Sequence, residues 1–248
     1  MTYGVIITIL ICLALLPWTL YFITYSKLKL VHIKAFLIGG MGWIIALILR
    51  TPILISASIV FTKVFQVMIA SLLAGVFEEG LRFYFINKFM REDFSAGRII
   101  SMGIGWGLFE AILTYVISMI SVLVIILYQI EVPDFEIPSQ KELLMGGLIG
   151  AYERNVAIAI HVGFTIIVTA SLMNRKWLGF AIIYHSLIDF IAAYLGLILP
   201  HTYQNLWIIE GIVTGLTILL YMIIALILKV RLAKAFTNSV IPSIFYRE

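Results

Sequence analysis

Seven long runs of apolar residues constrain this chain more than any other feature of its sequence. They cover approximately residues 3–24, 35–57, 62–87, 99–128, 154–173, 178–199 and 206–228. A helix needs about 20 apolar residues to cross the hydrocarbon core of a bilayer, so each run is long enough for one crossing. We therefore predict an all-α, polytopic transmembrane helical bundle of about seven spans (seven or eight), formed as a single integral membrane domain over residues 1–248.

The composition excludes a separate soluble domain. Hydrophobic residues make up 62% of the chain and charged residues only 12%, whereas soluble domains carry about 25% charged residues. The net charge of +4 is typical of loops beside a membrane and does not indicate a nucleic-acid partner. The single Cys12 excludes an internal disulfide. The first run lacks the basic start and the cleavage site of a signal peptide, so we expect it to be retained as a helix.

The distribution of basic residues predicts the orientation. Lys and Arg gather after every second run, and such segments face the cytoplasm in most membrane proteins. We therefore predict an outside N-terminus and a cytoplasmic C-terminus, in a plasma membrane of prokaryotic type. The residues are Lys27, Lys29 and Lys34 after the first run, Lys88, Arg91 and Arg98 after the third, Arg175 and Lys176 after the fifth, and Lys229, Arg231 and Lys234 after the seventh.

Ionisable residues also occur inside the apolar runs. A charge at the bilayer centre costs roughly 3 kcal/mol on insertion scales, so such residues usually mark a site, a pair or a pathway. At a rise of 1.5 Å per residue, carboxylates and imidazoles from four runs fall within roughly 10 to 18 Å of the cytoplasmic helix ends. We expect one polar centre in a water-accessible cavity that faces the cytoplasm. Its candidate members are Glu78, Glu79, Arg82, Glu110, His161, His185 and Asp189.

These residue types suit hydrolysis by either of two mechanisms. In the first, Glu110, His161 and His185 bind Zn²⁺, and Glu78 or Glu79 takes a proton from the bound water. In the second, a Glu and a His activate water without a metal, and the remaining His and Asp189 stabilise an oxyanion. The sequence leaves both mechanisms open.

Helical spacing predicts the partners of the charged residues. Arg82 lies three and four residues after the two glutamates and is able to hold either. Asp189 lies four residues after His185 and is expected to fix its tautomer. We place Glu153 and Arg154 at the outer membrane boundary, and we expect Arg50 to pair with Glu153 or to mark a helix break.

Four motifs in chain order resemble one known family. They are EExxR at Glu78 to Arg82, GxGxGxxE at Gly103 to Glu110, an ER pair followed by His161, and HxxxD at His185 to Asp189. This set resembles the YhfC family of intramembrane metalloproteases, which is similar to the clan of type II CAAX prenyl proteases and PrsW proteases. The resemblance covers about residues 70–195, the helices that carry the motifs. It implies that residues 1–69 and 200–248 form scaffold helices and a cytoplasmic tail.

The resemblance implies a zinc-dependent intramembrane protease that acts on a membrane-anchored peptide or protein. It implies catalytic roles for Glu78, Glu79, Arg82, His185 and Asp189. The second motif departs from the CAAX-type pattern, because Glu110 stands where those relatives have a His. Two other classes remain as alternatives: a proton- or ion-coupled transporter, although we find no internal repeat, and a non-catalytic membrane protein of the same fold.

Overall fold

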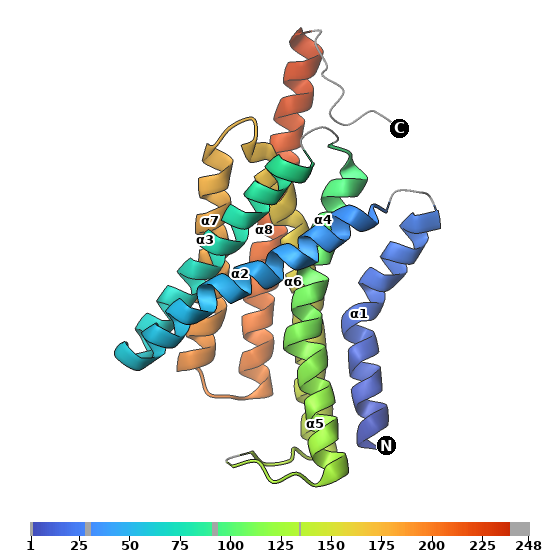
Figure 1. The fold of residues 1–248 in the computed structure, drawn as a ribbon, viewed down its shortest axis with the longest axis vertical. Coiled ribbons are helices and arrows are strands. Elements are labelled where there is room, and N and C mark those ends of the chain that lie inside the picture. Colours follow the sequence, from blue (N-terminus) through green and yellow to red (C-terminus); the bar gives the residue numbers. More distant parts are fainter. Residues whose placement is uncertain (1, 28–30, 91–93, 134, 239–248) are drawn as a thin grey trace.

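The protein is a bundle of long helices (Figure 1). Its structure is a computed structural model that describes residues 2–27, 31–90, 94–133 and 135–238. Of the basic residues behind the predicted orientation, Lys29 and Arg91 lie outside these ranges, and the side chains of Lys27, Lys229, Arg231 and Lys234 lie outside the described part as well.

The described residues form helices and connections, with no strand among them. Seven helical segments are long and apolar enough to cross a membrane when α4, η1 and α5 are counted as one. This confirms the predicted all-α transmembrane class. The elements are α1 (Tyr3–Lys27), α2 (Ile33–Val60), α3 (Lys63–Phe89), α4 (Ala96–Ala111), the π-helical η1 (Ile112–Val116), α5 (Ile117–Tyr128), α6 (Gln140–Ser171), α7 (Lys176–Ile198) and α8 (Tyr203–Asn238).

The fifth span begins earlier in the chain than predicted. We predicted a start at residue 154, but α6 begins at Gln140. Ser139 and Glu142 form a capping box, in which each side chain accepts a hydrogen bond from the other's backbone N–H. This S-x-x-E pattern is the sequence signal that marks the start. Glu153 and Arg154 therefore lie about midway along α6 instead of at its start, and their predicted place at the outer membrane boundary stays a prediction.

The helices alternate in direction, so their ends gather at two opposite faces of the bundle. The last turn of α3, the first turns of α4 and α7 and the C-terminal part of α8 share one face (Figure 1). We call this face the basic end, because Lys88, Arg98 and Lys176 lie there. The N-terminus and residues 61–62 and 199–202 lie toward the other face, which we call the opposite end. That the basic end faces the cytoplasm stays a prediction.

Helix α6 is the central element of the bundle. It packs against α1, α3, α4, α7 and α8, and 61% of its most apolar 18-residue window is buried, a larger share than in any other described span. On the far side of α4, α2 packs against both α3 and α4, and α3 packs against α7. The polar side chains of His161 and Thr165 on α6 are consequently surrounded by protein instead of lipid.

Glycines bring α4 close to two neighbours. A Cβ atom on Gly103 would lie 2.6 Å from the Val162 Cα, and one on Gly107 would lie 2.7 Å from the Ile158 Cα, both on α6. A Cβ on Gly105 would meet the carbonyl oxygen of Phe36 on α2. The alternating glycines thus serve two faces of α4, and small residues at such positions let membrane helices approach closely.

Replacing Gly107 by Ala is expected to lower the free energy of unfolding by about 1 to 3 kcal/mol, because the added methyl group meets backbone and forces α4 away from α6. The matched control is Gly146→Ala on α6, where an added Cβ meets nothing within 4 Å. Denaturation of both variants in mixed micelles measures the difference. Equal stability of the two would contradict the close packing of α4 on α6.

Candidate metal centre

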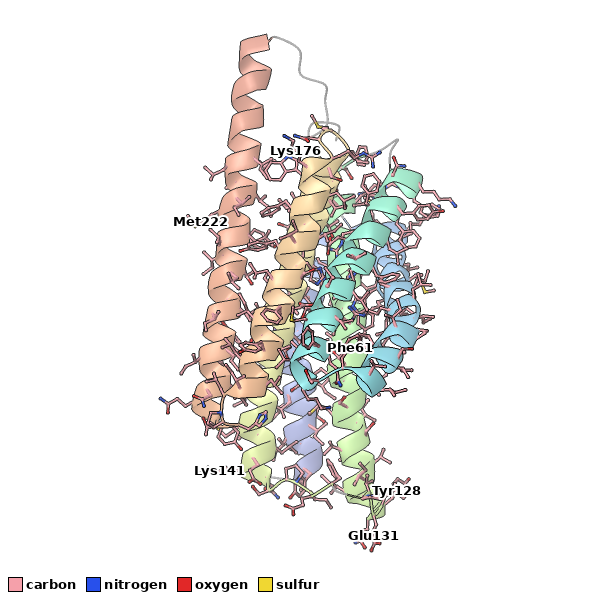
Figure 2. The ribbon with its side chains drawn as sticks, turned by 90° about the vertical axis from the view of Figure 1, so that its left-hand side faces the viewer. Phe61, Tyr128, Glu131, Lys141, Lys176 and Met222 are labelled. Atoms are coloured by element: carbon pink, nitrogen blue, oxygen red, sulfur yellow. The ribbon has the colours of Figure 1, made fainter. Side chains whose placement is uncertain are left out.

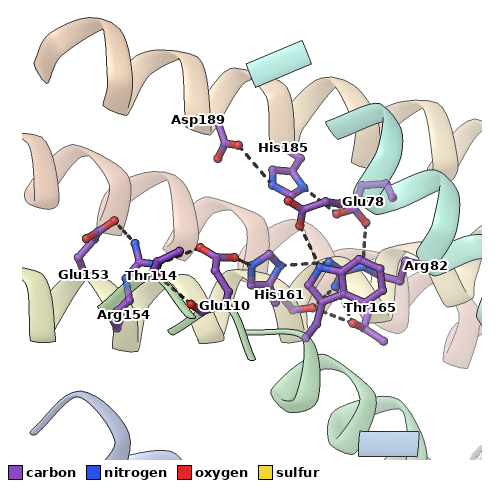
Figure 3. A network of polar contacts seen from close by, with 12 residues as sticks. Glu78, Arg82, Glu110, Thr114, Glu153, Arg154, His161, Thr165, His185 and Asp189 are labelled. Carbon is purple, nitrogen blue, oxygen red and sulfur yellow. Dashed lines mark hydrogen bonds and ion pairs between the residues drawn. The ribbon is translucent and has the colours of Figure 1, made fainter. Parts of the chain in front are cut away.

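The predicted site residues form one buried network in the middle of the bundle (Figure 3). Helix α3 contributes Glu78, Glu79 and Arg82, and their side chains are nearly or fully inaccessible to solvent. Helices α4, α6 and α7 contribute Glu110, His161, and His185 with Asp189. The structure therefore brings together every residue that the sequence singled out for the polar centre.

Arg82 connects α3 to α6. Its Nη1 donates to the His161 carbonyl oxygen at 2.6 Å and to Thr165 Oγ1 at 2.8 Å. Its Nε forms an ion pair with Glu79 Oε2 at 3.1 Å, and its guanidinium lies over the Trp106 ring, 4.3 Å from the centroid. Of the two glutamates that the spacing allowed, Arg82 holds Glu79.

The hydrogen bonds of His161 define its tautomer. Arg82 Nη2 lies 3.1 Å from His161 Nδ1, and a guanidinium is only a donor, so Nδ1 accepts this hydrogen bond. The proton of the neutral imidazole is then on Nε2, which donates to Glu110 Oε2 at 2.6 Å. This assignment follows from the donor chemistry of Arg82.

Glu78 accepts hydrogen bonds from two other helices. Arg50 Nη1 on α2 donates to its Oε1 at 2.9 Å, and Trp106 Nε1 on α4 donates to its Oε2 at 2.9 Å. The predicted Arg50–Glu153 pair is therefore wrong. The predicted helix break is also absent, since α2 continues through Pro52 to Val60.

His185 is oriented mainly by Glu79. Its Nδ1 lies 2.7 Å from Glu79 Oε1, and its ring stacks on Phe164 at a centroid distance of 4.8 Å. Its Nε2 lies 3.6 Å from Asp189 Oδ2, which is too long for a hydrogen bond. The prediction that Asp189 fixes this tautomer is corrected: Glu79 does so, and Asp189 lies beside the other ring nitrogen.

Arg154 extends the network along α6. Its Nη1 donates to Glu110 Oε1 and to Thr114 Oγ1, both at 2.9 Å, and its Nη2 pairs with Glu153. Thr114 belongs to η1, the π-helical turn that follows Glu110 almost directly. Single π-turns inside helices are frequent at functional sites, and this one places Thr114 against Arg154.

Three side chains within the described residues are arranged so that they could hold a metal ion. Glu78, Glu110 and His161 each offer one donor atom, and the three atoms lie within 4.8 Å of one another. Carboxylate oxygens and imidazole nitrogens are ligands that Zn²⁺ accepts. The sequence reading named Glu110, His161 and His185 as ligands. The geometric group shares two of these residues and takes Glu78 as its third.

The charge of the network also suits a cation. Six carboxyl groups at the site stand against three guanidinium groups. Buried charges need partners, and an excess of carboxylates is a setting in which a divalent cation is favourable. The carboxylates are Glu78, Glu79, Glu110, Glu153, Asp189 and Glu210, and the guanidinium groups are Arg50, Arg82 and Arg154.

A cavity of about 140 Å³ adjoins these donors. Glu78 lines it, whereas Glu79 does not. Glu210 on α8 also lines it, a residue that the sequence reading missed although it is an isolated carboxyl group inside the seventh apolar run. The complete lining is Arg50, Glu78, Glu110, Glu153, Arg154, Ala157, Ile160, His161, His185, Ile188, Asp189, Ala192, Glu210 and Val213.

Comparison with known proteins identifies the family. The family model for the YhfC intramembrane metalloprotease matches residues 12–213, which include all four motifs. The chain is 30% identical over 136 residues to the "Uncharacterized membrane protein YhfC" of Bacillus subtilis (strain 168), across 48% of this chain and 52% of that protein. The match thus spans about half of that relative's length. No solved structure matches. The chain belongs to the YhfC intramembrane metalloprotease family.

Proposed function

We propose that this protein is a membrane-embedded metallopeptidase that hydrolyses a peptide bond of a membrane-associated substrate. The observation that carries the proposal is the group formed by Glu78, Glu110 and His161, whose donor atoms lie within 4.8 Å of one another at a cavity that His185 also lines. The family to which the chain belongs supports the same chemistry.

In this proposal Glu78, Glu110 and His161 hold Zn²⁺. The ion supplies a Lewis acid that lowers the pKa of a bound water from 15.7 to about 7. His161 contributes Nε2, which carries a proton in the structure because Arg82 donates to Nδ1. That proton has to leave before the nitrogen can act as a ligand, so metal binding is coupled to proton release.

His185 has the separate role of moving a proton at the scissile bond. Its Nδ1 is held by Glu79, which Arg82 holds in turn. This chain of contacts keeps Nε2 on the side of Asp189 and of the cavity. A carboxylate behind an imidazole raises its basicity, which suits a group that accepts a proton and then delivers it to the leaving amine. Glu79 is thus a positioning residue.

Zinc content per chain tests the proposal. We expect about one zinc ion per wild-type chain, with loss in the Glu78→Ala, Glu110→Ala and His161→Ala variants, and retention in His185→Ala. The control is His201→Ala, a histidine outside the cavity lining. Elemental analysis of purified protein gives the numbers. Zinc lost from His185→Ala but kept in Glu78→Ala would make His185 the third ligand. Folded wild-type protein without zinc would contradict a zinc enzyme.

A further inference from the structure

The cavity extends from the donor group in one direction only. On α6 its other lining residues all precede His161, beginning with Glu153, and on α7 they all follow His185, ending with Ala192. Because α6 runs toward the basic end and α7 away from it, both sets lie on the side of the opposite end. The lining residues of α8, Glu210 and Val213, belong to its first three turns and agree with this direction.

Toward the basic end the site is closed by packed side chains. Arg82, Phe164 and Thr165 are all 0% exposed. On the side of the opposite end two lining carboxyl groups are partly exposed, Asp189 at 39% and Glu153 at 44%, whereas His161 and His185 are 4% and 5% exposed. The α2–α3 turn at Phe61 also stops short of the level that Tyr128 reaches (Figure 2). The packing therefore directs the cavity away from the basic end, which is the end that we predict to face the cytoplasm.

Glu210 is an unusual feature of this passage. Its side chain is buried, with 8% of the residue exposed, and it lines the cavity. Its Oε2 atom has no hydrogen-bond partner among the described residues. A buried carboxyl oxygen without a partner is costly, and a donor group brought in by a ligand would satisfy it. Glu153 and Asp189 line the same cavity. Its lining also includes Arg50 and Arg154, which pair with Glu78, Glu110 and Glu153. Five carboxyl groups against two guanidinium groups favour a cation in the passage.

We propose that the cavity is a port that admits substrate from the opposite end, and that Glu153, Asp189 and Glu210 bind a cationic group of that substrate. The positive-inside rule places the opposite end outside the cytoplasm. The chemistry of the port rests on the proposed function. The substrate is then an extracytoplasmic peptide segment that has a Lys or Arg side chain, or a free amino group, near the scissile bond.

Thiol labelling tests the side of access. In a Cys12→Ser background, Ala192→Cys places a thiol in the cavity lining. The exposed positions Gln204→Cys at the opposite end and Lys176→Cys at the basic end serve as references. With membrane-impermeant methanethiosulfonates, the thiols at 192 and 204 should react in right-side-out vesicles and the thiol at 176 only in inverted ones. Reaction at 192 only in inverted vesicles, or from neither side, would overturn the proposal, as would labelling at 176 from outside.

The charge of the reagent tests the cation site. At each thiol, the rate with a trimethylammonium reagent is divided by the rate with a sulfonate reagent. This ratio should be larger at 192 than at 204 by about tenfold or more, because nearby carboxylates attract the cationic reagent and repel the anionic one. Glu210→Gln should reduce this excess several-fold. An equal ratio at both positions, or an excess that Glu210→Gln leaves unchanged, would disprove the cation site.

The outcome is separable from that of the proposed function. Labelling needs neither bound zinc nor catalysis, so zinc content measured on the same purified protein reports independently. Zinc binding with reaction from the basic end would retain the metallopeptidase and overturn the port. Zinc-free protein with the expected labelling would retain the port and contradict the metal site.

Discussion

Replacing His185 by Ala is expected to lower peptide cleavage by at least about 100-fold, the smallest contribution usual for a positioned acid or base. Glu79→Gln should lower it by about 10- to 100-fold, the range typical for a partner that orients a functional imidazole. The smaller effect of Glu79→Gln follows from the positions of the two residues. His185 lines the cavity, whereas Glu79 does not line it and contacts His185 instead.

Cleavage is measured as new peptide N-termini in membranes that contain the wild-type protein, quantified by mass spectrometry against membranes that contain each variant. His201→Ala should behave as wild type, because this histidine lies outside the cavity lining. Each variant should also elute from a sizing column as the wild type does. Undiminished cleavage by folded His185→Ala would exclude the catalytic role, and an equal loss in both variants would give Glu79 a direct role.

Replacing Arg82 by Met is expected to lower the free energy of unfolding by about 3 to 5 kcal/mol, the usual cost of removing one partner from a buried ion pair. The change leaves the fully buried Glu79 carboxylate without its cation. It also removes the donors to the His161 carbonyl oxygen and to Thr165, which join α3 to α6. Denaturation in mixed micelles measures the loss.

Arg50→Met is the matched control for this prediction. Arg50 also pairs with a buried glutamate, but its own side chain is 16% exposed and Trp106 still donates to that glutamate, so a smaller loss than for Arg82→Met is expected. The double variant Arg82→Met with Glu79→Gln should recover part of the loss, because it no longer buries an unpaired charge. Unchanged stability of Arg82→Met would show that its buried contacts do not hold the bundle together.

The transmembrane fold was predictable because lipid permits few solutions. A run of about 20 apolar residues in a bilayer has to form a helix that satisfies its own backbone groups. All seven runs are helical, and six of them have bounds within about three residues of the prediction. The fifth differed because Gln140 to Glu153 is partly polar, so hydropathy alone did not extend the span to its capping box at Ser139.

Most members of the polar centre were also predictable, since an ionisable residue in an apolar run is costly wherever it packs. Its internal pairing was not. Spacing along one helix allowed Arg82 to hold either glutamate, and the choice of Glu79 depends on where α6 and α7 lie. Glu210 shows the same limit, because its role depends on a cavity that residues distant in sequence create together.

The sequence by itself determined the number of spans, their alternation and most of the buried charges, because these follow from the energy of each residue in lipid. Only the tertiary structure decided which charges pair, that Glu78 joins Glu110 and His161 as a donor group, and that the cavity extends toward the opposite end. Those features arise from contacts between helices, and a pattern read along one chain does not contain the distances between its segments.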